Sequence, residues 1–385
     1  MSTFEFPENN TEFYDFQKLL GDNKDVPLAY VQSLNIARQR MCDALASQPA
    51  SQAVIEAIEA YLPSLQYVLR VAEQQNCDSK RFGEGKGKFK WRSVLSKGIH
   101  MSLSTTMIVK PMVAMDSIWY EALNVLLSLA YTLANMANKR IGNLSSAGES
   151  LLTEGADLLC RAAGVFKTAR HALLPRWRNH VSPPPELCPE LLDVLSELML
   201  ADANRLAMAK AQRRGMSSTT LIKLGAVVMN GYEKCAACLK RLSKANAEEL
   251  ADPFRSYVED GAHMAEALLL RRYAELKHET NENGIAVASI TRAQNDLVKC
   301  LKADWIPYKK MANDLMGEYN EFQSRMVKIN NNITYQRIPE IGDVKAGILI
   351  GRAIAEIKPY TLPDALEPRP VKEEGTDAEG PEDES

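Results

Sequence analysis

The feature that most constrains this chain is a pair of amphipathic segments between residues 191 and 239. In the second segment, apolar side chains recur every three or four residues, at Leu221, Leu224, Val228, Tyr232, Cys235 and Leu239. The first segment carries a comparable stripe of Leu191, Leu195, Leu198 and Leu206. At 3.6 residues per turn each stripe falls on one face of an α-helix, which must be buried. The short glycine-containing link from Arg213 to Gly215 therefore predicts an antiparallel helical hairpin.

The same helical periodicity continues on both sides of this hairpin. It predicts helices over residues 30–46, 53–71, 118–136, 152–173, 284–304 and 307–329. A further helix is predicted from Asp252, read as its N-cap before Pro253, with Tyr257, Met264 and Leu268 facing inward. Strands do not alternate with helices along the chain. We therefore expect a mostly α fold built from repeated antiparallel helix pairs.

Three stretches lack the helical period. Residues 1–27 are polar and broken by prolines, and we expect this segment to wrap the core by docking the rings of Phe4, Phe6, Phe13, Tyr14 and Phe16. Residues 100–109 are compatible with a short strand. Residues 330–360 contain β-branched residues, a proline and several glycines, which predicts an extended C-terminal strap that crosses back over the helices.

Charge divides the chain into a body and a tail. The formal net charge is −3, but the segment from Asp364 onward has nine acidic and two basic residues, a local charge of −7 that leaves +4 for the rest. This segment has almost no large apolar side chain, so it cannot offset its ordering entropy. We predict one helical domain over residues 1–363 and a disordered acidic tail over residues 364–385.

The termini and the cysteines indicate a cytoplasmic protein. The sequence begins MSTFEFPENN, which has neither the basic flank nor the apolar core of a secretory signal, and no run of eighteen apolar residues is present. We therefore expect no transmembrane segment. The seven cysteines lie mostly at helix-core positions, which favours reduced thiols. Cys235 and Cys238 form a C-x-x-C within a helical stripe, and structural packing is favoured over metal or redox use.

Signals for catalysis are missing. The five histidines have neither an H-x-x-x-H spacing nor a matched carboxylate motif, and no G-x-S-x-G or nucleotide signature is present. We expect no enzyme activity, no cofactor, no metal and no nucleic-acid partner.

A glycine-rich basic loop lies between residues 77 and 97. Lys86, Lys88 and Lys90 stand among glycines, but GEGKGKFKW lacks the G-x-x-x-x-G-K-[ST] spacing of a phosphate-binding loop. A flexible solvated loop is the favoured interpretation. The alternative is a peripheral contact of these lysines with an anionic membrane or an acidic partner.

Four short motifs, in this order, resemble the Bro domain family of Alix-like and BROX-like endosomal-sorting proteins. They are Phe89-Lys90-Trp91, the AGVFK of residues 163–167, the LADAN of residues 200–204, and NNNITYQRIP at residues 330–339 followed by IGRA at residues 350–353. The resemblance spans roughly Phe4 to Pro363. It implies an elongated, curved stack of tetratricopeptide-like antiparallel helix hairpins, with a few short strands and a C-terminal strap.

The resemblance also implies a function and a site. Members of the family are non-enzymatic scaffolds that bind the C-terminal helix of an ESCRT-III subunit in a concave groove, which implies a cytoplasmic protein recruited to endosomes. The corresponding positions here are Ala207, Thr220 and Leu224, where relatives carry large apolar side chains, with Glu149 as an acidic contact. Only Leu224 keeps a large apolar side chain. A helical adaptor for a different peptide is the alternative function, and simple core packing is the alternative role for Leu224.

Overall fold

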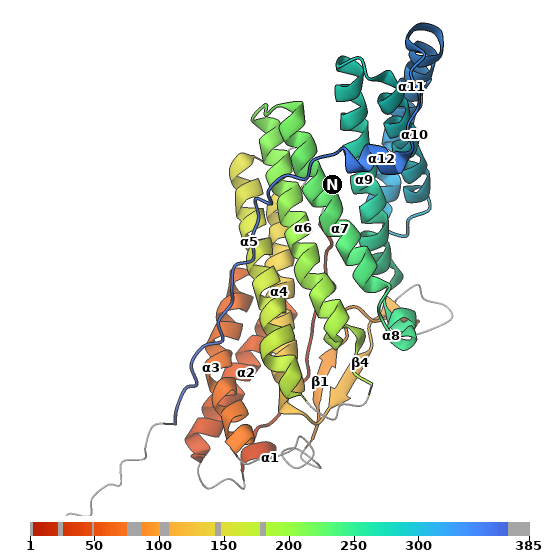
Figure 1. Cartoon of the computed structure of the whole chain (residues 1–385). Helices are drawn as coiled ribbons and strands as arrows, with labels where there is room; N and C mark the ends of the chain where they lie inside the picture. The colour runs from red at the N-terminus through yellow and green to blue at the C-terminus, as the bar shows by residue number, and fades with distance from the viewer. Residues whose placement is uncertain are drawn as a thin grey trace, which may run out of the picture.

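The structure is a computed structural model that describes residues 3–21, 26–47, 50–74, 87–100, 108–142, 148–177 and 182–368. It is an elongated stack of helices that stand side by side along the long axis (Figure 1). The α-helices of the described chain are α1 (Gln17–Leu20), α2 (Leu28–Ser47), α3 (Gln52–Gln74), α4 (Ile118–Ile141), α5 (Glu149–Thr168), α6 (Pro189–Arg213), α7 (Ser218–Leu239), α8 (Lys244–Glu249), α9 (Asp252–Glu279), α10 (Asn283–Cys300), α11 (Ile306–Ile329) and α12 (Ile341–Ala346). Successive long helices pack on one another, which confirms the predicted fold class.

The α6–α7 hairpin is the centre of this stack. Every apolar residue of the two predicted stripes is buried, because α6 packs on α5 as well as α7, and α7 packs on α9. The link adopts a left-handed backbone at Gly215, where φ is 66°, a conformation that glycine adopts without a side-chain clash. The side chain of Ser217 then caps α7 by accepting a hydrogen bond from the amide of Thr220.

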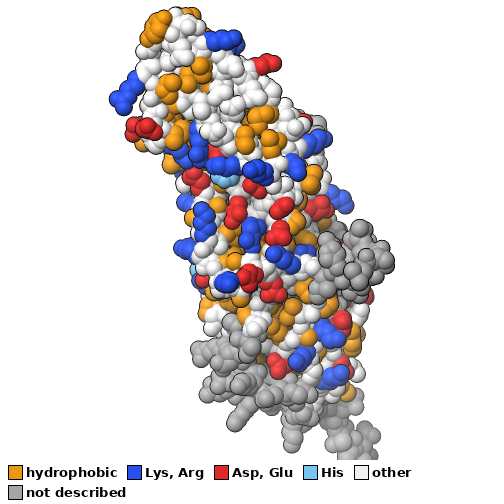
Figure 2. Space-filling model, turned by 90° about the vertical axis from the view of Figure 1, so that its right-hand side faces the viewer, with side chains coloured by type: hydrophobic (Ala, Val, Ile, Leu, Met, Phe, Trp, Pro, Cys, Tyr) orange, Lys and Arg blue, Asp and Glu red, His pale blue; other side chains and the backbone are white. Residues whose placement is uncertain are grey.

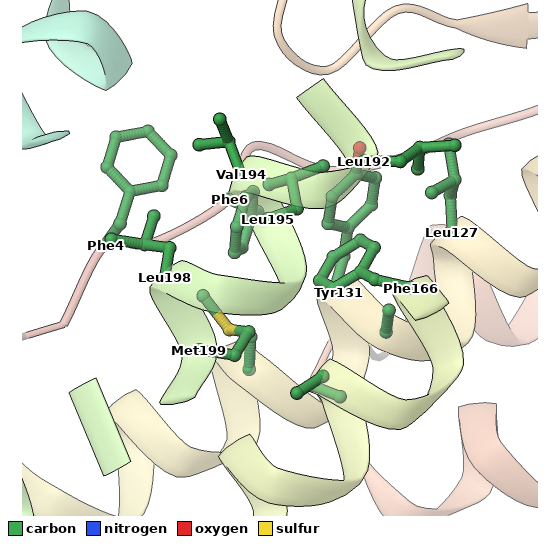
Figure 3. Close-up of a cluster of buried hydrophobic side chains, with 14 of the residues drawn as sticks. Phe4, Phe6, Leu127, Tyr131, Phe166, Leu192, Val194, Leu195, Leu198 and Met199 are labelled. Atoms are coloured by element: carbon green, nitrogen blue, oxygen red, sulfur yellow. The ribbon is translucent and has the colours of Figure 1, made fainter. Parts of the chain in front are cut away.

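The N-terminal segment docks its rings into the helical core, as predicted for four of the five aromatic residues. Figure 3 shows Phe4 and Phe6 among side chains from α4, α5 and α6. The amide of Phe6 donates to Asn135 Oδ1 at 2.8 Å, which fixes the extended backbone against α4. The prediction was wrong for Phe13, which is 63% exposed. In an extended chain side chains alternate, so docking Tyr14 turns Phe13 to the other side.

Short strands occupy one end of the stack, beside α4. Strand β1 (Phe89–Arg92) pairs antiparallel with β4 (Met112–Met115), so that Phe89 lies opposite Met115. Strands β2 (Ile99–His100) and β3 (Ile108–Val109) form a second antiparallel pair. A single strand over residues 100–109 was wrong: His100 ends β2 and Ile108–Val109 form β3, so the two ends of this segment pair with each other, and residues 101–107 lie outside the described part of the chain.

Next to these strands, the short 3-10 turn Pro185–Leu187 buries the carboxyl group of Glu186. This group accepts hydrogen bonds from the hydroxyl of Ser93 at 2.8 Å and from the amide of Val94 at 3.0 Å. Burial raises the pKa of Glu186 to about 7, even though these two donors and Lys110 favour the ionised form.

This raised pKa predicts a loss of stability as the pH rises. The folded pKa lies above the ordinary carboxyl value of 4.5, so the contribution of Glu186 is complete below pH 4.5 and is lost as the pH rises through 7. Between pH 5 and pH 8 the wild type should lose about 2–3 kcal/mol of unfolding free energy that Glu186→Gln does not lose. Urea unfolding of both proteins at the two pH values measures the difference. Identical pH dependence in both would contradict the assignment.

The C-terminal strap crosses the stack but is only partly extended. The helix of α11 continues through a π-helical turn at Asn330–Thr334, and α12 adds a further helical turn, so the prediction of an extended segment from Asn330 was wrong for these residues. The Asn330 side chain donates to the carbonyl of Gln336, which closes the turn. After a turn at residues 347–348, the strap is extended from residue 349 to 368 and runs over α7, α6 and α5 to α3 (Figure 1).

One smaller prediction needs correction. Helix α9 begins at Asp252 itself, with Ala251 in the N-cap position and no side-chain cap. The amide of Ala251 donates to the carbonyl of Leu95, which holds the chain extended up to that residue. Of the residues predicted to face inward from α9, Tyr257 and Met264 are buried, and Leu268 is partly buried and packs against the core.

Candidate partner-binding site

The four residues that the sequence singled out for partner binding gather at the end of the α6–α7 hairpin. Ala207 lies six residues before the end of α6 and Leu224 six residues after the start of α7. At 1.5 Å per residue both are therefore about 9 Å from the hairpin turn, on antiparallel neighbours. Thr220 is in the first turn of α7. We call these three residues, together with Glu149, the hairpin-end site.

Leu224 belongs to a small apolar cluster that is separate from the main core. It packs with Ala211, Leu221 and the half-buried Met208, and it is 9% exposed. Ala207 and Thr220 are half-buried. This cluster is therefore nearly closed to solvent, and the small side chains of Ala207 and Thr220 add little apolar surface at the hairpin end.

Glu149 enters the site from α5, where it is the first helical residue. Its carboxylate pairs with Arg214 of the hairpin turn at 2.9 Å, and both side chains are about half exposed. An acidic residue in the first turn is also favoured by the helix dipole. The pair fixes the start of α5 against the hairpin, but an exposed pair like this one contributes little to stability.

The sequence interpretation missed the strap as a neighbour of this site. The amide of Gly351 donates to the carbonyl of Lys223, the residue before Leu224. The side chain of Asn204, one turn before Ala207, accepts from the amides of Ile354 and Ala355. The strap thus runs along the inner edge of the hairpin-end site with Ile350 60% and Ile354 58% exposed. The only sequence signal for this position of the strap was that the expected strap contains apolar residues.

A buried polar cluster supports α6 and α7 below the site. The carboxylate of Asp202, in the LADAN motif, accepts from Tyr232 at 2.6 Å and from Tyr257 at 2.8 Å. It also pairs with Arg205 at 2.9 Å. Burial raises the pKa of Tyr257 well above its usual value of 10.0, so its hydroxyl remains protonated and acts as a donor. Asp202 therefore ties α6, α7 and α9 together.

Two of the three lysines of the basic loop, Lys88 and Lys90, lie at the other end of the molecule, at or next to β1. Lys88 and Lys90 are exposed, and Lys90 pairs with Glu12 at 2.7 Å. Lys86 lies outside the described residues.

Packing and ion pairing explain the other side chains that could be reactive or bind a metal. Burial raises the pKa of Cys235 well above its usual 9.0, which suppresses its reactivity. His263, Glu266 and Asp296 bring possible ligand atoms within 4.8 Å of one another, but their carboxylates already pair with Arg292, Lys299 and Lys345. Figure 2, a view onto the α9–α11 side, shows acidic and basic side chains interleaved on this face.

Within the described residues, no helix combines the length and the apolar character needed to cross a bilayer. Stacked helical hairpins with a shallow apolar surface at one hairpin end define a helical scaffold of the kind that binds peptides. Comparison with models of known protein families identifies the family. The model of the BRO1-like domain matches residues 22–377, so the chain belongs to that family.

Characterised relatives match only part of their own length. The pH-response regulator protein palA/RIM20 of Emericella nidulans is 27% identical over 261 residues, which cover 66% of this chain and 29% of that protein. The apoptosis-linked gene 2-interacting protein X 1 of Caenorhabditis elegans is 27% identical over 170 residues, which cover 44% of this chain and 18% of that protein. This chain thus spans less than a third of these relatives.

Solved structures confirm the fold. The ALIX BRO1 CHMP4C complex aligns with a TM-score of 0.68 and 16% identity, covering 94% of this chain and 96% of that one. ALIX in complex with the SIVmac239 PYKEVTEDL late domain aligns with a TM-score of 0.72 and 17% identity, covering 94% of this chain and 50% of the other. At these identities the similarity carries the fold alone.

Proposed function

We propose that this protein is a non-enzymatic scaffold that binds the C-terminal helix of an ESCRT-III subunit at the hairpin-end site. The observation that carries the proposal is the separate apolar cluster around Leu224, at the hairpin end and beside the exposed strap residues Ile350 and Ile354. An amphipathic helix that lays its apolar face on such a surface follows a common recognition mode. The family and its complex of ALIX with CHMP4C support this choice of partner.

The chemistry of the site predicts a weak complex. Ala207 and Thr220 offer little apolar area and Leu224 is only 9% exposed, so most of the apolar contact comes from the strap isoleucines, with Leu224 beneath it. Glu149 is held by Arg214, and a basic residue of the partner helix would share its carboxylate. A partner suited to this site has an apolar stripe flanked by lysine or arginine.

Two opposite substitutions test the proposal by calorimetric titration of ESCRT-III C-terminal peptides. Leu224→Asp should weaken binding by at least about 2 kcal/mol, roughly 30-fold, because it places a charge in the apolar contact. The double variant Ala207→Phe with Thr220→Ile should strengthen binding several-fold, because it enlarges the apolar surface.

Val298→Asp is the matched control, since Val298 is an exposed apolar residue on the distant helix α10. It should bind as the wild type does. Thermal unfolding shows whether Leu224→Asp retains the fold, and the gain in the double variant cannot arise from unfolding. Peptide affinities unchanged in both hairpin variants would refute the site.

A second candidate function is a helical adaptor for a different peptide through the same surface. Ala207 and Thr220 favour this adaptor role. Their small side chains leave room for a bulkier partner side chain than the large apolar residues of relatives would. Saturable binding to none of the ESCRT-III peptides, with a folded protein, would favour this adaptor role.

We further propose that the protein is recruited to endosomal membranes, with the basic loop making a weak anionic contact. Lys88 is exposed near β1, and Lys90 has only an exposed carboxylate partner. Co-sedimentation with anionic liposomes should fall when salt is raised from 50 to about 300 mM, because the Debye length shortens below 10 Å. It should also fall in the variant Lys86→Glu, Lys88→Glu, Lys90→Glu. Equal pelleting of variant and wild type would remove this contact.

A further inference from the structure

A cavity of about 580 Å³ lies between the α6–α7 hairpin and the helices α9 and α11. Its lining follows α9 from Gly261 to Arg272, a span of eleven residues and therefore about 16 Å. We call it the α6–α9 cleft. It is distinct from the hairpin-end site, because none of Ala207, Thr220, Leu224 or Glu149 lines it.

The walls of the cleft are apolar and adaptable. Methionines line it from three helices, Met208 of α6, Met264 of α9 and Met311 of α11. Unbranched, polarisable methionine side chains adjust to ligands of irregular shape. Gly225 of α7 keeps the cleft open, because a Cβ there would lie 3.2 Å from Leu269 Cδ1 and 3.7 Å from Met208 Sδ.

The two ends of the cleft differ in charge. At the inner end the guanidinium of Arg205 is matched by Asp202 at 2.9 Å. At the outer end Arg213 and Arg272 both line the cleft, and Arg272 donates to the neutral amide of Gln212 at 2.8 Å. No aspartate or glutamate is among the described residues of the lining. The guanidinium of Arg272, with the neutral Gln212 as its hydrogen-bond acceptor, therefore makes the outer end positive, and the length behind it is apolar.

We propose that the α6–α9 cleft binds a single-chain anionic amphiphile, with a long-chain carboxylate as the simplest case. The apolar chain lies along α9 between the methionines, and the carboxylate meets Arg272 at the outer end. Arginine suits this role, since its planar guanidinium pairs with both oxygens of a carboxylate.

Two other occupants fit less well. Helices α7 and α9 pack directly on each other, which leaves room for a single chain and not for a third helix. The acidic C-terminal segment has the right charge, but almost no large apolar side chain to fill the walls. The cavity size is within the range of about 300–1,000 Å³ that small-molecule sites occupy.

Calorimetric titration of the full chain with dodecanoate, below its micelle concentration, tests the proposal. We expect saturable binding at one site. Gly225→Leu projects a side chain between Leu269 and Met208 and should weaken binding at least tenfold. Gly317→Leu is the matched control, because Gly317 is also inside a helix and a Cβ there meets nothing within 4 Å. It should bind as the wild type does.

A charge variant distinguishes the contribution of the outer end to binding from that of the apolar walls. Arg272→Gln should weaken dodecanoate at least fivefold and leave the affinity for neutral dodecanol unchanged. Absence of saturable binding, or equal affinity in Gly225→Leu and the wild type, would overturn the proposal. So would a Gly225→Leu variant that loses only ESCRT-III peptide binding, which would assign the cleft to a partner side chain. The dodecanoate titration contains no peptide, so its result is independent of the proposed function.

Discussion

Replacing Glu121 with alanine should lower the free energy of unfolding by about 3–5 kcal/mol, the usual cost of breaking a buried ion pair from one side. Glu121 of α4 is fully buried, and its carboxylate accepts from Arg38 Nε at 2.8 Å and from Trp91 Nε1 at 2.6 Å. Tyr61 donates a further hydrogen bond at 3.1 Å. Burial and the Glu121 charge raise the pKa of Tyr61 well above 10.0, so the phenol remains a donor. Loss of the carboxylate leaves the buried Arg38 charge uncompensated.

Urea unfolding measures this loss of stability, and two other variants test whether the unpaired Arg38 charge causes it. Glu12→Ala removes the exposed partner of Lys90 and should cost less than about 1 kcal/mol. The double variant Arg38→Met with Glu121→Leu should be markedly more stable than Glu121→Ala, because it removes both charges and keeps the volume filled. A double variant no more stable than Glu121→Ala would show that the charge imbalance is not the cause.

Asp202→Ala should cost a similar 3–5 kcal/mol, for the same physical reason at the centre of the hairpin. The substitution leaves the buried guanidinium of Arg205 without its carboxylate, and it removes the acceptor of Tyr232 and Tyr257. Because these tyrosines come from α7 and α9, the loss should also loosen the packing between the hairpin and the rest of the stack.

Asp193→Ala is the control for this prediction, since Asp193 is an exposed residue of α6 that pairs with Arg170. It should change stability by less than about 1 kcal/mol. Thermal unfolding followed by circular dichroism measures both variants. If Asp202→Ala unfolds at the temperature of Asp193→Ala, the Asp202 cluster does not stabilise the stack.

Periodic apolar stripes were sufficient to predict the long helices, but not the short helices α1, α8 and α12. The stripe around Leu224 and Val228 specified a buried face, and both residues are buried. Such patterns depend only on local geometry, which one sequence contains in full. The start of α9 shows the limit. Aspartate is a common N-cap residue. At Asp252, however, the backbone hydrogen bond between Ala251 and Leu95, residues far apart in sequence, decides where the helix begins.

The polar clusters could not be predicted from one sequence. Glu121, Arg38 and Trp91 come from three separate elements, and nothing in the spacing of these residues links them. The F-x-W motif of residues 89–91 was visible in the sequence, and the structure shows what its two aromatic side chains contact. Phe89 stacks on Tyr14 with ring centroids 4.0 Å apart, and Trp91 donates to Glu121.

The candidate site was predictable only in part. The resemblance named Ala207, Thr220, Leu224 and Glu149, which do gather at one hairpin end, while their role in binding stays a prediction. The neighbouring strap isoleucines and the α6–α9 cleft depend on how distant helices pack. Leu268, predicted to face inward, packs against the core and also lines that cleft.

Hydrogen–deuterium exchange of the full chain, with and without a saturating ESCRT-III C-terminal peptide, shows where the peptide binds. We expect slower exchange at the C-terminal end of α6, the first two turns of α7 and strap residues 350–355, with α10 and α11 unchanged. Bound peptide that leaves these three segments unchanged, or that protects another face of the stack, would contradict it.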